Sequence, residues 1–270
     1  FKNILKDSNA DALSKFIRVS QPLQETWEVY QQELWNVGLE RARILNKQGI
    51  SLHFLGQKTF PDTLKTISEP PYWIFVEGNL QNLFKMSVAV VGTRKPTEDG
   101  MFLTKLVISA LADTGIVTVS GLASGIDQLC HVESLRYGLP TVAVLGNGIF
   151  VEYPKGSNAI KAAIVGNGGT VITEYLPDQI YSAENFVRRN RLQAALSNAL
   201  IPVEWKIKSG TAHTVEYAYK YNKKIANLYL PKTYALRPEL KYSEQNRSAL
   251  SFEVPRDISG VIDYILGSQD

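Results

Sequence analysis

The sequence predicts an α/β protein with a doubly wound, Rossmann-like and mainly parallel sheet, preceded by a small helical domain. From residue 87 onward, short apolar runs that end in glycine or a polar residue alternate with segments of helical periodicity. Continuous apolar runs are typical of strands buried on both faces of a parallel sheet. Strands and helices alternating at this spacing indicate right-handed crossovers. Residues 1–57 show helical spacing only, which predicts the separate helical domain.

Composition places the chain among ordinary globular proteins. It has 270 residues, of which 44% are hydrophobic and 20% charged. No run approaches the roughly 18 apolar residues of a spanning helix, and no signal peptide is visible, so we expect a cytoplasmic protein without membrane contact. A single cysteine, Cys130, excludes an internal disulfide. The net charge of +3 is too small to identify a nucleic-acid binder by itself.

The amino-terminal part reads as helices at residues 10–19, 24–36 and 39–48, with Gly38 as a break and Gly49 as a stop. Residues 72–76 are strongly β-prone after two prolines, and we interpret them as a short edge strand. The expected division is a helical domain at 1–57 and an extended Rossmann-like domain with its tail at 58–270.

The regular part begins with a strand at 88–91. Further strands are expected at 117–120, 141–145, 170–174, 199–203 and 224–228. The helices between and after them are expected at 99–113, 126–137, 158–165, 191–196, 212–221 and 258–266. After Pro231 only the last of these segments looks helical.

Three turns, at Gly92, Gly121 and Gly146, each follow a buried strand. The ends of parallel strands share one rim, so these turns are expected to meet in space. Glycine there either lets backbone N–H groups approach a ligand or only permits a tight connection. The first turn also contains Arg94 and Lys95. Cations beside outward-pointing N–H groups predict an anion site.

A second basic segment contains Arg188, Arg189 and Arg191, placed just before the helix expected at 191–196. A helix amino terminus attracts anions, and the arginine fork suits phosphate oxygens. The alternative for Arg191 is an internal ion pair with Glu174 or Glu204.

Enzyme signatures are weak. The glycine turns lack the G-x-G-x-x-G spacing of dinucleotide sites, and no phosphate-binding G-x-x-x-x-G-K-[ST] loop occurs. Adjacent Cys130 and His131 point to different faces of a helix and form no dyad. The one enzyme-like hint is the turn at residues 209–211 followed by Glu216. We therefore expect no catalytic residue, no metal and no cofactor.

From Phe60 to about Leu230 the chain resembles the DprA/Smf family of bacterial DNA-processing proteins. The matching pieces, in order, are Phe60-Pro61-x-x-Leu64-x-x-Ile67 with Pro70-Pro71, Val91-Gly92-Thr93-Arg94-Lys95-Pro96, Ser120-Gly121-Leu122-Ala123-Ser124-Gly125-Ile126-Asp127, Ala143-Val144-Leu145-Gly146, Tyr153-Pro154-Lys155-x-x-Asn158 and Arg189-Asn190-Arg191. Departures occur at Val187, where the family has proline, and at residues 209–212. The segment after Pro231 is too short for the winged-helix domain of many members, so a divergent member is expected.

The resemblance implies a small helical (SAM-like) domain before an extended Rossmann core. It also implies a non-enzymatic homodimer that binds and protects single-stranded DNA and helps load RecA recombinase, notably in natural transformation. Arg94 and Lys155 match the positions most associated with DNA contact. Together with the rim, we expect DNA contacts from Gly92, Thr93, Arg94, Lys95, Gly121, Ser124, Gly146, Lys155, Asn158, Arg188, Arg189, Arg191, Ser209, Gly210 and Thr211.

Two alternatives stay open. One is a nucleotide-binding Rossmann protein similar to the LOG phosphoribohydrolases, whose Gly-Thr pair is present at Gly210-Thr211 but whose Pro-Gly-Gly turn is absent. The other is an interaction scaffold whose DNA site has decayed.

Overall fold

The computed structural model describes residues 27–267, and the chain divides into two compact units, residues 1–50 and 51–270. The described element of the first unit is the helix α3 (Trp27–Lys47). The expected break at Gly38 is wrong, because the helix continues through it. A glycine costs a helix about 1 kcal/mol relative to alanine without a clash, and the flanking residues are good helix formers. The helix expected at 10–19 lies outside the described residues.

Residues 50–54 form a strand, β1 (Ile50–Phe54), so the helical interpretation of 1–57 is wrong for these residues. Strand β1 lies at the edge of a nine-stranded sheet. The next strand, β2 (Trp73–Gly78), lies between β1 and β6 (Thr170–Thr173) and is therefore not the expected edge strand. A short helix, α4 (Asp62–Lys65), connects the two. The division after residue 57 stays a prediction.

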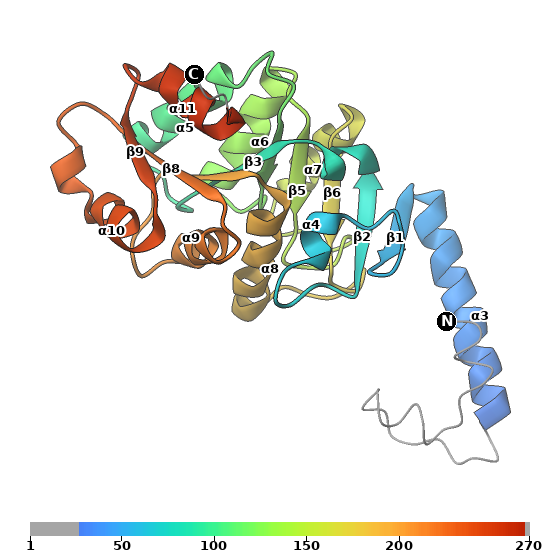
Figure 1. Ribbon diagram of the computed structural model, residues 1–270. Coiled ribbons are helices and arrows are strands. Elements are labelled where there is room, and N and C mark those ends of the chain that lie inside the picture. Colours follow the sequence, from blue (N-terminus) through green and yellow to red (C-terminus); the bar gives the residue numbers. More distant parts are fainter. Residues whose placement is uncertain (1–26, 268–270) are drawn as a thin grey trace. The chain divides into compact units, whose positions relative to one another are not determined.

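The centre of the sheet is β3 (Ser87–Val91), where Val88 lies opposite Thr118 on one side and Ala199 on the other. The strands around it are β4 (Val117–Ser120), β5 (Thr141–Val144), β7 (Ala199–Pro202), β8 (Lys224–Tyr229) and β9 (Leu250–Glu253). Strands β3 to β9 run parallel in the order β6-β5-β4-β3-β7-β8-β9, and β2 pairs antiparallel with β6 (Figure 1). The predicted fold class is therefore confirmed.

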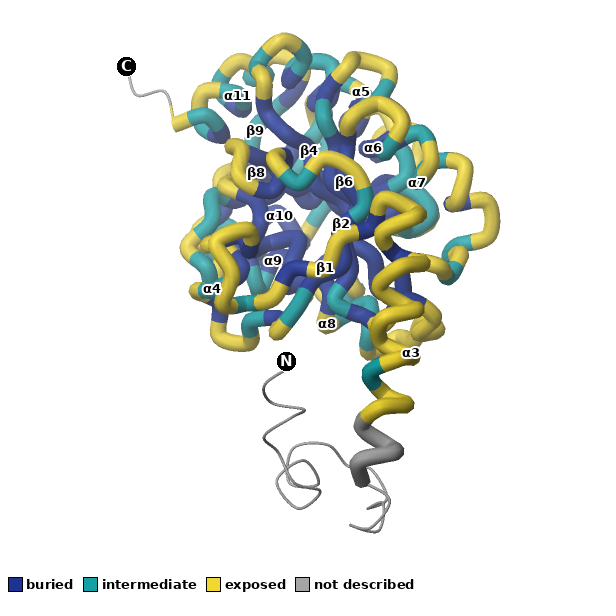
Figure 2. The backbone as a smooth tube through the Cα atoms, turned by 90° about the vertical axis from the view of Figure 1, so that its right-hand side faces the viewer, coloured by how far each residue is buried: buried dark blue, intermediate teal, exposed yellow. Residues whose placement is uncertain are grey.

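Helices cover both faces of the sheet, whose strands form the buried centre (Figures 1 and 2). On one face lie α5 (Glu98–Ala110), α6 (Ile126–Arg136), α7 (Ser157–Gly166) and α11 (Ile258–Leu266). The other face carries α4, α8 (Ala183–Leu196) and α9 (Gly210–Lys220). The side chains of β3 point alternately to the two faces of the sheet. Val88 and Val90 pack against the first layer of helices, and Ala89 and Val91 pack against the second.

Two expectations for the distal part are wrong. Helix α8 begins at Ala183, well before residue 191, because the Ser182 hydroxyl accepts the Asn185 N–H and Glu184 lies in the first turn. The segment after Pro231 contains α10 (Pro238–Arg247) and the parallel strand β9 besides α11. Short 3₁₀ turns lie at Leu80–Phe84 and Tyr234–Leu236. Between residues 27 and 267, no helix has the length and apolarity needed to cross a membrane.

A truncation test follows from β1. His53 is buried, and its ring nitrogens lie 2.8 Å from the hydroxyls of Ser51 and Thr59. A chain of residues 49–270 keeps these two hydrogen bonds, whereas one of residues 58–270 loses them. At about 1 kcal/mol for each bond, the shorter chain should melt roughly 4–8 °C lower. Thermal unfolding followed by circular dichroism checks this, and equal melting temperatures would show that β1 adds nothing to the sheet.

Candidate nucleic-acid interface

A crevice of about 640 Å³ opens beyond the carboxyl ends of β3 and β7. The connection after β3 leads toward β4 and the one after β7 leads toward β8, so this is the switch point where open α/β sheets bind ligands. We call it the rim crevice. Seven of the fifteen expected DNA-binding residues line it, namely Gly92, Thr93, Arg94, Arg189, Ser209, Gly210 and Thr211.

The turn after β3 presents side chains rather than free backbone donors. Arg94 and Lys95 are exposed. Three N–H groups of this turn already have acceptors: Thr93 donates to the Glu204 carbonyl at 2.7 Å, Lys95 to the Thr93 hydroxyl at 3.3 Å, and Thr97 to the Glu204 carboxylate at 2.9 Å. Glu204 therefore occupies the amino terminus of α5. The expectation that the N–H groups of this turn bind an anion is therefore not supported. The side chains of Arg94 and Lys95 are the groups of this turn that can still bind one.

The three arginines lie within α8 and not before a helix, and they differ in environment. Arg188 is exposed. Arg191 is 1% exposed and donates to both Glu174 carboxylate oxygens, at 2.5 and 2.6 Å, and to the Glu69 carbonyl at 2.8 Å. The internal pair with Glu174 is thus the observed alternative, and a DNA contact from Arg191 does not fit this burial.

Arg189 is buried and bridges the sheet to α8. Its Nη1 donates to the carbonyl of Gly121 at 2.7 Å and to that of Val144. These carbonyls follow β4 and end β5, so one guanidinium joins two neighbouring strand ends. Burial lowers the pKa of Arg189 to about 10, and Asp127 opposes that change. Like Arg191, Arg189 uses its guanidinium for internal contacts that hold the rim together, and not for contact with a ligand.

The rim glycines make room for side chains. A Cβ on Gly121 would lie 2.4 Å from the Arg189 guanidinium, and one on Gly146 would lie 2.4 Å from the Phe186 ring. At Gly92 the Cβ position is taken by Ile126 at 2.6 Å. The glycines therefore permit close packing of helices on strand ends. Close approach of backbone to a ligand is not their evident purpose.

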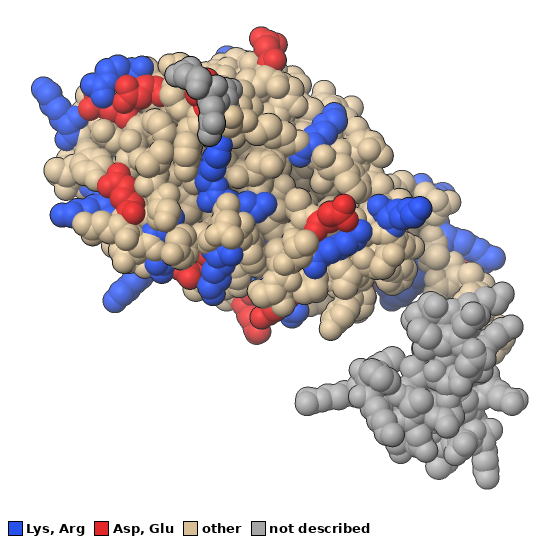
Figure 3. All heavy atoms as spheres, viewed as in Figure 1, with Lys and Arg blue, Asp and Glu red and all other residues tan. Residues whose placement is uncertain are grey.

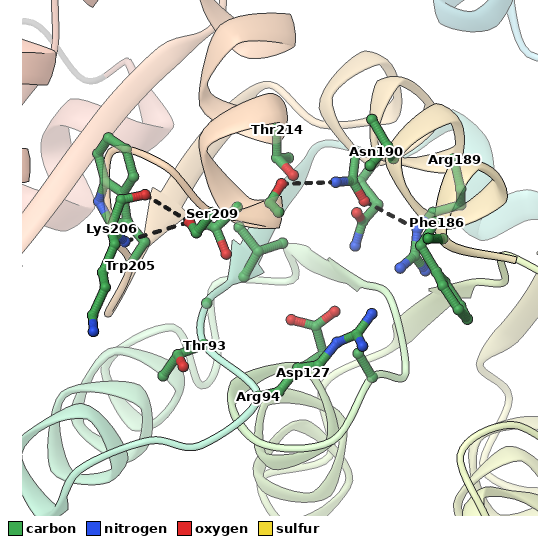
Figure 4. A pocket seen from close by; sticks show the side chains of 18 of the residues that line it. Thr93, Arg94, Asp127, Phe186, Arg189, Asn190, Trp205, Lys206, Ser209 and Thr214 are labelled. Carbon is green, nitrogen blue, oxygen red and sulfur yellow. Dashed lines mark hydrogen bonds between the residues drawn. The ribbon is translucent and has the colours of Figure 1, made fainter.

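Asp127, in the first turn of α6, faces the crevice beside Arg94 (Figure 4). It is 6% exposed, and its Oδ2 accepts the Gly121 N–H at 3.1 Å. Burial raises the pKa of Asp127 to about 6, against the opposing effects of Arg189, of the N–H groups of Gly92 and Gly121, and of Arg94. The residue stands in the matched Ser-Gly-Leu-Ala-Ser-Gly-Ile-Asp motif, but its position between two arginines depends on the fold.

An aromatic cluster, consisting of Tyr153, Tyr181 and Phe186, lines the crevice and was missed by sequence reasoning. The Arg94 guanidinium lies 5.3 Å from the centroid of the Phe186 ring, toward which it extends in Figure 4. The available signal was the Tyr-Pro motif at Tyr153, which precedes the exposed Lys155 by two residues.

Of the other expected residues, Asn158 and Ser124 are not among those that line the crevice, whereas residues 209–211 are. Asn158 is exposed in the first turn of α7, and Glu152 accepts its N–H at 3.3 Å and that of Gly156 at 3.0 Å. Ser124 is half-buried in the turn after β4. Residues 209–211 open α9, which has neither an acidic residue in its first turn nor a side-chain cap. Asn190 of α8 donates to the Gly210 carbonyl at 3.0 Å and so ties α8 to this turn (Figure 4).

The enzyme-like hint at Glu216 is not part of the crevice. Its carboxylate pairs with Arg247 of α10 at 2.6 Å and lies 4.0 Å from Lys220. Within residues 27–267, no group of three His, Cys, Asp or Glu side chains is placed to hold a metal ion. On the face turned to the viewer in Figure 3, lysines and arginines are scattered among acidic side chains and form no broad basic patch. On this face, the distribution of charge does not mark a binding site.

Comparisons with known proteins extend over most of the second unit. A family model described as DNA recombination-mediator protein A matches residues 51–239. Protein Smf of Borreliella burgdorferi is 31% identical over 216 residues, 80% of this chain and 67% of that protein. DNA processing protein DprA of Streptococcus pneumoniae is 38% identical over 159 residues, 59% of this chain. The match spans 56% of that protein and 44% of Protein Smf of Escherichia coli, about half of each.

Solved structures show the same fold. DprA of Streptococcus pneumoniae superposes with a TM-score of 0.72 and 30% identity, over 81% of this chain and 77% of that one. DNA processing protein A of Helicobacter pylori, described for its single-stranded DNA binding mode, gives a TM-score of 0.69 and 25% identity. That match covers 79% of this chain and 96% of the other.

The raised pKa of Asp127 predicts a pH dependence of stability. The folded state holds a proton on Asp127 up to about pH 6, whereas the unfolded chain releases it near the ordinary value of 3.8. Protonation therefore stabilises the fold below pH 4, and this contribution of up to about 3 kcal/mol is lost as the pH rises through 6. Asp127→Asn keeps an acceptor for the Gly121 N–H but does not titrate. The free energy of unfolding of both proteins is measured with urea between pH 4 and 8. As the pH rises, Asp127→Asn should become more stable relative to the unchanged protein. A difference in free energy that stays constant with pH would contradict the raised pKa of Asp127.

Proposed function

The chain belongs to the DNA recombination-mediator protein A family, the DprA/Smf family that its motifs indicated, and we propose that it binds single-stranded DNA across the rim crevice. The family match and the Helicobacter pylori relative, described for its single-stranded DNA binding mode, support this proposal. The crevice supports it by position, because it lies at the switch point of the sheet.

The observation that carries the proposal is the placement of Arg94. This exposed cation stands three residues after the buried strand β3, in a turn that the Thr93 N–H holds to the Glu204 carbonyl, and its guanidinium lies over the Phe186 ring. A phosphate that meets it finds a positioned, charge-assisted donor at little cost in ordering. Lys155 is exposed two residues after Tyr153, which lines the crevice, and we expect it to supply a second cation. Phosphate contacts of this kind give affinity that falls with salt.

The finer parts of the proposal rest on family membership. We propose on this ground that the protein is cytoplasmic, has no enzymatic turnover and forms a homodimer. We also propose that it protects single-stranded DNA and helps to load a RecA recombinase onto it. The position of Glu216 gives no support to a phosphoribohydrolase, because Arg247 holds its carboxylate and Glu216 is not among the residues that line the crevice. We therefore propose a mediator of recombination rather than an enzyme acting on nucleotides.

Arg94→Ala should weaken single-stranded DNA binding by about tenfold or more, because a charge-assisted contact contributes about 1.5–3 kcal/mol. The matched control is Arg136→Ala, which removes the same charge at the carboxyl end of α6, on the opposite edge of the sheet. The Arg136 side chain is 69% exposed, but Glu133, its ion-pair partner at 3.6 Å, is only 6% exposed, so thermal unfolding must show that Arg136→Ala is folded. Fluorescence anisotropy with labelled oligo-dT at several salt concentrations measures both variants.

The salt dependence separates a specific contact from general attraction. Loss of one phosphate contact should lower the salt slope by about 0.7 for Arg94→Ala and leave it unchanged for Arg136→Ala. Equal losses of affinity at the two positions would mean that the rim crevice is not the DNA site.

A further inference from the structure

The three rings of the aromatic cluster lie next to one another on the wall of the rim crevice. Ring centroids are 3.9 Å apart for Tyr153 and Tyr181, 5.0 Å for Tyr153 and Phe186, and 6.2 Å for Tyr181 and Phe186. The ring planes are tilted by 30–35° to one another, between a parallel and an edge-to-face arrangement. Two regions distant in sequence, the β5–α7 connection with Tyr153 and residues 181–186 at the start of α8, thus present one aromatic surface.

The two connections that carry Tyr153 and Tyr181 also hold exposed apolar side chains. The exposed fractions are 37% for Phe150, 57% for Leu176, 74% for Ile180 and 46% for Tyr181. Backbone hydrogen bonds hold these two connections together. The Phe150 N–H donates to the Pro177 carbonyl at 3.0 Å, and the Gly148 N–H donates to the Gln179 carbonyl at 2.8 Å. An apolar surface that is ordered yet left in water marks an interaction site.

One cation lies against the cluster, and a second follows it closely in the chain. The Arg94 guanidinium lies 5.3 Å from the Phe186 centroid, and the exposed Lys155 follows Tyr153 by two residues. Rings next to cations match the repeat of a single strand, in which a base with an open π-face alternates with a phosphate. A duplex hides those faces, and an uncharged apolar partner would leave the cations without a counterpart.

We propose that the aromatic cluster is a stacking platform for the bases of single-stranded DNA, with Tyr181 as its outermost ring. The inference rests on the proposed function and adds the part of the strand that this surface recognises. Arg94 and Lys155 bind phosphates, while the cluster and the neighbouring Ile180 receive bases. The platform makes the site prefer unpaired strands without reading their sequence, since every base has a π-face.

The test compares oligo-dT with an abasic oligonucleotide of the same length, which keeps the phosphates and lacks the bases. Tyr181→Ala should weaken binding of oligo-dT about fivefold or more and leave binding of the abasic strand unchanged. Its salt slope should equal that of the unchanged protein, because no phosphate contact is lost. Tyr181→Trp, which keeps a stacking ring, should bind oligo-dT at least as tightly as the unchanged protein.

Tyr137→Ala is the matched control. Tyr137 is 42% exposed, close to the 46% of Tyr181, and lies at the carboxyl end of α6 away from the crevice. It should leave the affinity for both oligonucleotides unchanged. Thermal unfolding checks that each variant is folded, and the tryptophan variant keeps the test valid if Tyr181→Ala is unstable.

The outcomes separate the two claims. If the unchanged protein binds the abasic strand as tightly as oligo-dT, or if Tyr181→Ala weakens both equally, DNA binding stands and the stacking platform is overturned. If the unchanged protein binds neither, the proposed function fails and the platform fails with it. A change in oligomeric state on gel filtration for Tyr181→Ala, with DNA affinity unaltered, would assign this surface to a second copy of the chain and overturn the inference.

Discussion

The buried guanidinium of Arg189 is the interaction on which the rim depends. It joins the carbonyls of Gly121 and Val144, where two neighbouring strands end, to the middle of α8, and it does so through space that a side chain on Gly121 would occupy. With α8 fixed in this way, Phe186 packs on Gly146, and Arg94 extends over its ring. A buried charged group thus positions the exposed cation that can meet a ligand.

The protein's own carboxylates already occupy several anion-attracting positions on this rim. Glu204 accepts N–H donors at the start of α5, Glu152 does so at the start of α7, and Asp127 accepts the Gly121 N–H beside α6. These carboxylates complete the helix ends and lower the local positive charge. Recognition of a polyanion at the crevice is therefore left to a few positioned side chains and to apolar contact, which agrees with the scattered charges on the face shown in Figure 3.

The sequence predicted the parallel strands well, because strands buried on both faces carry continuous apolar runs. It missed β1 and β9, whose short and partly exposed segments carry little signal, and the polar first half of α8. Arg94 could be predicted because its position at a strand end is a local property. The ion pair of Arg191 with Glu174 was one of the expected alternatives. The carbonyl partners of Arg189 could not be predicted, since they lie far away in the chain, 68 positions in the case of Gly121. Phe186 was missed for the same reason, because its ring meets residues of other segments.

The central claim is that single-stranded DNA crosses the carboxyl ends of β3 and β7. A crystal structure of the protein with a short oligo-dT tests it most directly. We predict a phosphate oxygen within hydrogen-bond distance of the Arg94 guanidinium and at least one base against the ring of Tyr181. A strand bound along the opposite edge of the sheet, near Arg136, or along α3, with the rim crevice empty, would contradict it.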